Sequence, residues 1–122
     1  MGRIVVSIPH RFVSLNDYIN AERTNRYMAA KIKKSETQVA ENAFRGLQTI
    51  LEPCRVRFTW VVKDKRRDLD NIAFAKKYIL DGAVNAGVLK GDNMKYIVGF
   101  EDVLQFDDSE RVEVDFIESD TV

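Results

Sequence analysis

Hydrophobic and polar residues alternate with a period of two in several stretches of the chain, and this pattern predicts four strands. The clearest strand runs from Cys54 to Lys63, with its large hydrophobic side chains at even-numbered positions. Shorter strands are predicted over Arg3 to Ile8, Lys95 to Glu101 and Arg111 to Glu118. The polar sequence Asp107-Asp108-Ser109 is the expected turn between the last two strands.

Hydrophobic residues at three- and four-residue intervals predict two helical segments between these strands. The first begins at Ser14, a good N-cap, extends to about Leu51, and is either continuous or broken near Ala21–Thr24. The second is predicted over Asn71 to Asn85, with Asp70 as its N-cap and Asn85-Ala86-Gly87 as its end.

The predicted order of elements is β-α-β-α-β-β, which places the chain in the α/β class, in its α+β form. We expect a small mixed sheet of four strands covered by two helices, most simply on one face. The last two strands are expected to form an antiparallel hairpin. A chain of 122 residues, 45% of them hydrophobic, predicts one domain spanning residues 1–122.

Composition excludes several classes of protein. No hydrophobic run approaches the ~20 residues of a membrane span, so no membrane partner is expected. The single Cys54 forms no internal disulfide, which favours a reducing cytoplasm. With one cysteine and only His10 as histidine, a structural zinc site is nearly excluded.

Charge is distributed unevenly, although the net charge is zero. Residues 1–67 hold 14 Lys and Arg against 6 Asp and Glu, an excess of eight positive charges that residues 68–122 reverse. A basic half of this kind favours contact with nucleic acid. The simpler interpretation is that the two halves neutralise each other within the fold or across a dimer.

The most distinctive motif is Lys65-Arg66-Arg67-Asp68-Leu69-Asp70-Asn71, followed by Asp92. Two carboxylates at positions i and i+2 lie on one side of an extended backbone. Carboxylate oxygens are the ligands that Mg²⁺ prefers, and a phosphate can supply further ligands. The motif therefore predicts a site at which Asp68, Asp70 and Asp92 hold a divalent cation against a nucleic-acid phosphate.

Helical geometry indicates which lysine belongs to this site. If Asp70 caps the second helix, Lys77 and Asp81 return to within roughly 20° of its face, whereas Lys76 does not. Asp81 is then expected to pair with Lys77 at i, i+4 and to orient it. A lysine stem leaning towards the helix start can reach a phosphate held there.

Three segments together resemble the RusA-type Holliday junction resolvases. They are Arg66-Arg67-Asp68-Leu69-Asp70-Asn71, Lys77-Tyr78-Ile79-Leu80-Asp81 and Ala86-Gly87-Val88-Leu89-Lys90-Gly91-Asp92. The resemblance implies a RusA-like fold and a homodimeric, Mg²⁺-dependent endonuclease, with Mn²⁺ as a substitute ion and no nucleotide cofactor. It also implies four-way DNA junctions as substrates in recombination and repair, and a bacterial or prophage origin.

The resemblance carries catalytic roles over to Asp68, Asp70, Asp92 and a lysine. In the family pattern the lysine stands three residues after the asparagine, where this chain has Phe74, so the assignment lies between Lys77 and Lys76. Helical geometry favours Lys77. A second departure is Gly91, at a position where the family often has another aspartate. Asn71 and Asp81 are expected to support the catalytic residues.

The expected DNA contacts are basic residues around this motif and on the first helix: Arg66, Arg67, Lys76, Arg23, Lys31, Lys33 and Lys34. A solvated helix face is the simpler interpretation of the last four. Two alternative functions stay open. One is a DNA-binding module of the same fold without cleavage activity, and the other is a metal-dependent nuclease for other branched or single-stranded DNA.

Overall fold

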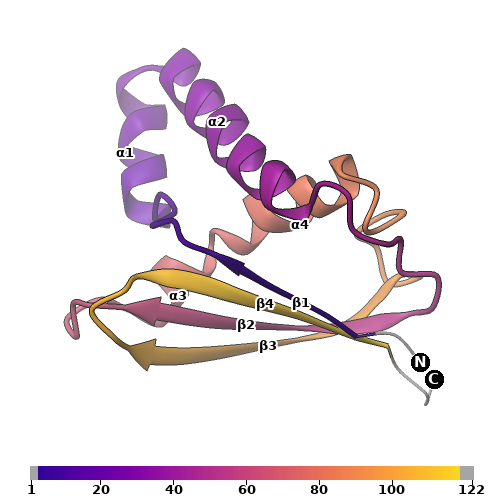
Figure 1. Cartoon of the computed structure of the whole chain (residues 1–122). Helices are drawn as coiled ribbons and strands as arrows, with labels where there is room; N and C mark the ends of the chain where they lie inside the picture. Colours follow the sequence, from indigo (N-terminus) through magenta and orange to yellow (C-terminus); the bar gives the residue numbers. More distant parts are fainter. Residues whose placement is uncertain (1–2, 119–122) are drawn as a thin grey trace.

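A computed structural model describes residues 3–118 of the chain (Figure 1). The elements follow in the order β1 (Arg3–Ile8), α1 (Leu15–Thr24), α2 (Arg26–Phe44), β2 (Cys54–Val62), α3 (Leu69–Ala73), α4 (Lys76–Asn85), β3 (Ile97–Phe106) and β4 (Arg111–Glu118). The predicted α+β class and the four-stranded mixed sheet are confirmed. The helices α1, α2 and α4 lie on one side of the sheet (Figure 1).

The strand order is β1-β4-β2-β3, so the predicted C-terminal hairpin is wrong. β4 lies between β1 and β2 and is antiparallel to both, while β3 is parallel to β2 at the edge. The reason lies in the side chains. β4 buries Val112, Val114, Asp115 and Phe116, whereas β3 buries only Ile97. The strand with more residues to bury takes the inner position.

The first predicted helix is two helices. Ser14 caps α1 as predicted, because its Oγ accepts a hydrogen bond from the Asp17 backbone at 3.4 Å. The break falls at Asn25, which adopts an extended conformation and whose side chain caps α2. The expected continuation to Leu51 is wrong, since α2 ends at Phe44. Gly46, just beyond it, has φ +85°, a conformation that closes helices and that glycine adopts without strain.

The second predicted helix is also divided, into α3 and α4, with Phe74 and Ala75 between them. The predicted N-cap role of Asp70 is wrong, because Asp70 lies inside the first turn of α3. Asp68 occupies the cap position, although its side chain makes no capping hydrogen bond. The predicted end is confirmed: α4 stops at Asn85, and Gly87 has φ +83°.

The core lies between the sheet and the helices. The even-numbered side chains of β2 are buried as predicted, and they pack with Phe44 from α2, Tyr78 and Ile79 from α4 and Phe116 from β4. Cys54 is completely buried where β2 begins. Among the described residues, the Tyr78 hydroxyl is the one buried side-chain polar atom without a hydrogen bond, and burial raises its pKa.

Gly82 permits the closest approach in this core. A methyl group placed on Gly82 would lie 2.6 Å from the Ala40 side chain and 2.7 Å from the backbone nitrogen of Glu41. These distances are shorter than van der Waals contact, so α4 packs on α2 through the bare backbone of Gly82. The position of α4 relative to α2 therefore depends on the absence of a side chain at residue 82.

We predict that Gly82→Ala destabilises the protein by about 1–3 kcal/mol, because overpacking outweighs the better helix propensity of alanine. Thermal unfolding followed by circular dichroism measures the effect. Asn85→Ala, at an exposed position of the same helix, is the control and should be neutral or slightly stabilising. Equal melting temperatures for Gly82→Ala and the wild type would contradict the close packing.

Candidate functional site

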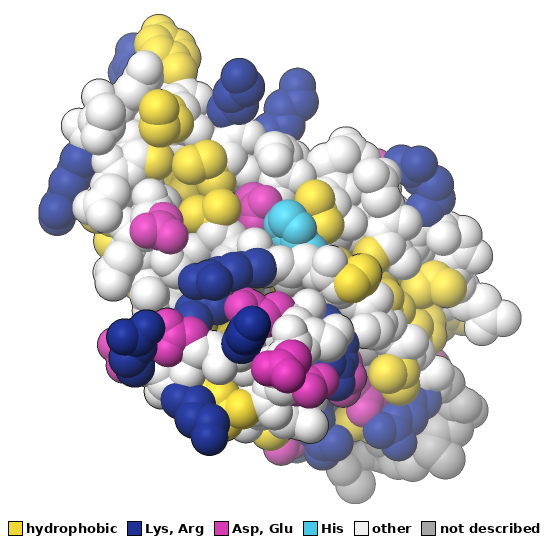
Figure 2. Space-filling model, turned by 60° about the vertical axis from the view of Figure 1, so that its left-hand side comes forward, with side chains coloured by type: hydrophobic (Ala, Val, Ile, Leu, Met, Phe, Trp, Pro, Cys, Tyr) yellow, Lys and Arg dark blue, Asp and Glu magenta, His cyan; other side chains and the backbone are white. Residues whose placement is uncertain are grey.

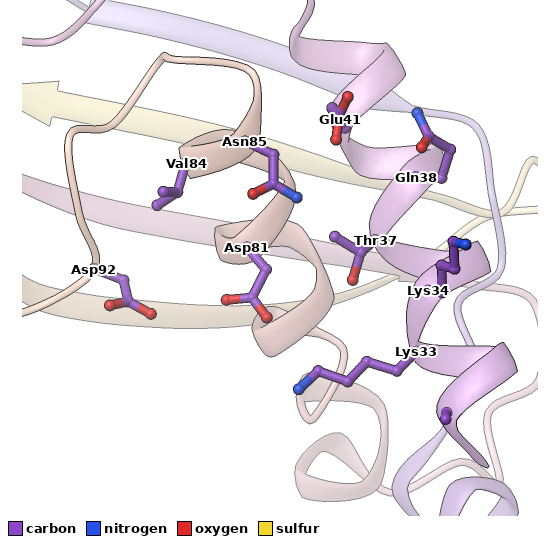
Figure 3. A pocket seen from close by; sticks show the side chains of 10 residues that line it. Lys33, Lys34, Thr37, Gln38, Glu41, Asp81, Val84, Asn85 and Asp92 are labelled. Carbon is purple, nitrogen blue, oxygen red and sulfur yellow. The ribbon is translucent and has the colours of Figure 1, made fainter. Parts of the chain in front are cut away.

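An open groove of about 610 Å³ lies between α2 and α4 (Figure 3). The lining residues of α2 recur at helical spacing and are Ala30, Lys33, Lys34, Thr37, Gln38 and Glu41. The lining residues of α4 and the following loop are mainly polar and are Asp81, Val84, Asn85 and Asp92. Lys33 extends from α2 towards α4, opposite the carboxylates of Asp81 and Asp92 (Figure 3). The groove thus brings cationic side chains of the first half of the chain to acidic side chains of the second.

Lys77 connects the two carboxylates at the edge of this groove. Its Nζ lies 3.2 Å from Asp81 Oδ1 and 3.8 Å from Asp92 Oδ2. The predicted pairing of Lys77 with Asp81 at i, i+4 is confirmed. The loop after α4 places Asp92 on the same side of that helix as Asp81 (Figure 3). The ammonium group of Lys77 supplies the positive charge that keeps the two carboxylates together.

Lys76 points in another direction, towards the sheet. Its Nζ lies 2.7 Å from Asp102 Oδ2 on β3 and 4.7 Å from the centre of the Phe100 ring. Trp60 Nε1 donates to the other oxygen of Asp102 at 2.9 Å. Only 23% of the Lys76 side chain is exposed, against 53% for Lys77. Lys76 therefore holds α4 on β3. To make its predicted contact with DNA, Lys76 would have to leave the ion pair with Asp102.

The carboxylates of Asp68 and Asp70 lie on the exposed surface at and just inside the start of α3. Asp70 Oδ1 accepts a hydrogen bond from the backbone of Asn71 at 2.9 Å. Asn71 Oδ1 in turn accepts one from the backbone of Asn16 at 2.8 Å, which ties α3 to the start of α1. Asn71 thus links α3 to α1, and its expected support of the catalytic residues stays a prediction.

The three aspartates do not form a closed ligand set. Within residues 3–118, no group of three or more Asp, Glu, His or Cys side chains is arranged to hold a metal ion. Asp92 lies with Asp81 and Lys77, while Asp68 and Asp70 lie on α3. The three carboxylates fit a divalent cation only in part, because the ammonium group of Lys77 already provides the positive charge next to Asp92.

The basic residues predicted to contact DNA differ in how much of each side chain is exposed to solvent. Arg66 is 90% exposed and pairs with Asp64 at 3.1 Å, and its hydrogen bonds lower the pKa of that carboxyl. Arg67 is only 12% exposed and lies 3.7 Å from Glu110. Burial, reinforced by the nearby charge of Arg11, lowers the pKa of Arg67. Arg66 is thus accessible to a phosphate, while Arg67 is largely enclosed.

The remaining basic residues, Arg23 on α1 and Lys31, Lys33 and Lys34 on α2, are all exposed. Basic side chains also stand out along the edges of the face in Figure 2. Lys33 and Lys34 line the groove, whereas Arg23 and Lys31 do not. Two of the four expected basic contacts thus line the same groove as Asp81 and Asp92.

Sequence reasoning missed two features that shape the site. Thr37, Gln38 and Glu41 line the groove, and their spacing from Lys34 was the available signal. Glu36 is buried on the core side of α2, where it accepts hydrogen bonds from His10 Nε2 at 3.0 Å and from the Val13 backbone at 2.8 Å. Glu36 lies on the same helix face as Ala29, Ile32 and Ala40, and nothing in that pattern indicated its distant partners.

Comparison of the chain with models of known protein families yields no match, and comparison with curated proteins yields none either. The resemblance to the junction resolvases therefore rests on the motif residues between 66 and 92. No helix within residues 3–118 has the length and apolar character needed to cross a membrane.

We predict that Lys76 and Lys77 differ in their contributions to stability. Lys76→Met keeps the apolar stem but removes the partner of a largely enclosed Asp102, and should cost about 1–3 kcal/mol. Lys77→Met removes exposed ion pairs and should cost less than about 1 kcal/mol. Urea unfolding of both variants measures the difference. A larger loss for Lys77→Met would show that the ion pair of Lys76 is not a structural contact.

Proposed function

We propose that this protein is a structure-selective DNA endonuclease that cleaves four-way junctions. The observation that carries the proposal is the groove, because Lys33 and Lys34 line it together with Asp81 and Asp92, the two carboxylates that hold Lys77. A groove with basic side chains on one wall attracts a phosphate backbone. The spacing of residues 66–92 supports the same proposal independently of the groove.

In this proposal Lys77 is the residue that faces the reacting phosphate. Asp81 and Asp92 fix its ammonium group, so that little reorganisation is needed when negative charge develops on the phosphate. Lys33 and Lys34 hold the flanking phosphates. Because the three aspartates are not assembled around one point, we derive no step through a metal ion. Mg²⁺, with Mn²⁺ as a substitute, stays the predicted cofactor.

Two alternative functions remain distinguishable by experiment. A DNA-binding module of the same fold would bind the junction but leave it intact at every concentration of Mg²⁺. A nuclease for other branched or single-stranded DNA would cleave those substrates in preference to the junction. A cytoplasmic location and a bacterial or prophage origin belong to the same proposal and stay predictions.

A four-way junction offers two symmetry-related scissile sites, so a two-fold symmetric dimer would supply one active site for each. The open edge of the sheet supports this part of the proposal. In the described part of the chain, β3 pairs with β2 alone, and it carries exposed Val98, Phe100 and Phe106 along its ten residues. A long, hydrophobic edge of this kind favours pairing with another strand.

One register of β3 against a second β3 is self-complementary. With the two-fold axis at Val103, each Phe100 faces Phe106 of the second copy and each Glu101 faces Gln105. An axis at Glu101 or at Asp102 would place that carboxylate against itself, and an axis at Leu104 would place Glu101 against Asp107. Like charges directly opposite each other destabilise a strand pair, so among the axes at the four central residues, 101 to 104, the Val103 register is favoured.

We predict that Asp70→Asn and Asp92→Asn each slow cleavage of a synthetic four-way junction by about a hundredfold or more, while binding persists or tightens. The resemblance assigns both carboxylates to the cation, which a neutral amide holds poorly, whereas the amide also removes a charge that repels phosphate. Single-turnover cleavage with and without Mg²⁺ and a gel-shift assay on the same preparation measure both effects. Asp108→Asn, in an exposed turn, is the control. Cleavage at the wild-type rate would overturn the assignment.

We also predict that charge at residue 105 controls dimerisation. Gln105→Glu places a carboxylate opposite Glu101 of the second copy and should weaken the dimer several-fold. Gln105→Lys should strengthen it by a similar factor. Sedimentation equilibrium over a range of protein concentrations measures both. Equal dissociation constants for the two variants, or a monomer at all concentrations, would exclude this register.

A further inference from the structure

The connection between α1 and α2 is an unusually short and well-held tip. Asn25 alone separates the two helices, and its backbone N–H donates to Ala21 O at 2.8 Å. Its side-chain oxygen accepts a hydrogen bond from the Tyr27 backbone, also at 2.8 Å. Thr24 Oγ1 donates to Asn20 O at 2.9 Å. These hydrogen bonds hold the backbone of the tip, which projects away from the sheet (Figure 1).

This tip carries exposed hydrophobic side chains among basic ones. Tyr27 is 73% exposed and Met28 is 48% exposed. The guanidinium carbon of Arg26 lies 5.5 Å from the centre of the Tyr27 ring. Arg23 stands in the last turn of α1, and Lys31 lies one turn further along α2. In Figure 2, hydrophobic side chains protrude at the top of the molecule with basic side chains beside them.

The tip is continuous with the groove. Ala30, Lys34, Gln38 and Glu41 line the groove from one face of α2. Tyr27 lies seven residues before Lys34, which is within about 20° on the helix and about 10 Å along its axis. A DNA strand that follows the groove past Lys34 would therefore reach the Tyr27 ring within two or three nucleotides.

We propose that Tyr27 stacks on an unpaired or unstacked base at the branch point of the DNA, with Met28 beside it. The inference rests on the proposed function and assigns the selectivity for branched DNA to this tip. In a linear duplex every base is already stacked on both faces, so an aromatic ring gains nothing there without first opening the helix. At a branch point a base face is open, and the ring covers it at little cost.

The charges at the tip favour DNA over an apolar partner. Arg26 lies against the aromatic ring, Arg23 and Lys31 are exposed on the two helices that meet at the tip, and phosphates flank every base. The nearest acidic residue in the sequence, Glu22, lies before Arg23 on α1. DNA with an exposed base matches both the positive charge of the tip and its aromatic surface. A hydrophobic protein surface would match only the aromatic surface.

The test compares binding to a synthetic four-way junction and to a linear duplex of the same length and composition, by fluorescence anisotropy without divalent cation. We expect Tyr27→Ala to weaken junction binding about tenfold, the size expected for the loss of one base–aromatic stack, and to change duplex binding less than twofold. Tyr27→Phe keeps the ring and should bind like the wild type. Leu51→Ala, which removes another exposed hydrophobic side chain, should change neither affinity.

A second measurement reports on the base itself. With 2-aminopurine at the branch point, the wild type and Tyr27→Phe should change the fluorescence on binding, and Tyr27→Ala should not. Equal loss of junction and duplex affinity in Tyr27→Ala, or no loss at all, would overturn the role of the tip while leaving the proposed function standing. A wild-type protein that binds neither DNA would overturn the proposed function and this inference together.

Discussion

The contact between Gly82 and Ala40 sets the distance on which the rest of the site depends. Because α4 lies against the backbone of α2 at this point, the side chains on either side of the contact must diverge into solvent. Lys33, Lys34 and Glu41 on α2 and Asp81 and Asn85 on α4 consequently line one groove. The close approach at Gly82 thus sets the distance between the two helices whose charged side chains line the groove.

Two consecutive lysines at the start of α4 serve different surfaces. Adjacent residues on a helix point about 100° apart, so one of any such pair can face the sheet while the other faces solvent. Lys76 pairs with Asp102 and fixes the helix on the edge strand β3, and Lys77 pairs with Asp81 and Asp92 in the groove. One helical turn thus contributes a contact with the sheet and a charge at the groove.

Local patterns predicted the elements well and their long-range arrangement less well. The bounds of β1 and β4, the cap at Ser14 and the pair of Lys77 with Asp81 follow from interactions within a few residues, and all are confirmed. The place of β4 inside the sheet depends on competition between strands for buried positions, which no single segment contains. The break between α3 and α4 and the partners of Glu36 and Lys76 likewise depend on tertiary packing. Helical geometry drawn from Asp70 predicted the pair of Lys77 with Asp81 correctly, although the helix on which it was based is not continuous.

The thiol of Cys54 offers a different kind of access to this molecule. It is completely buried where β2 meets β3 and β4, and burial raises its pKa to about 11. At neutral pH hardly any thiolate is present, and the thiolate is the form that reacts with alkylating reagents. The thiol of the native protein should therefore react very slowly with such reagents. The rate at which Cys54 is modified would then report how often the sheet opens. For the same reason a cysteine introduced on the surface carries a label alone, which makes the chain a natural single-site scaffold for spectroscopic probes.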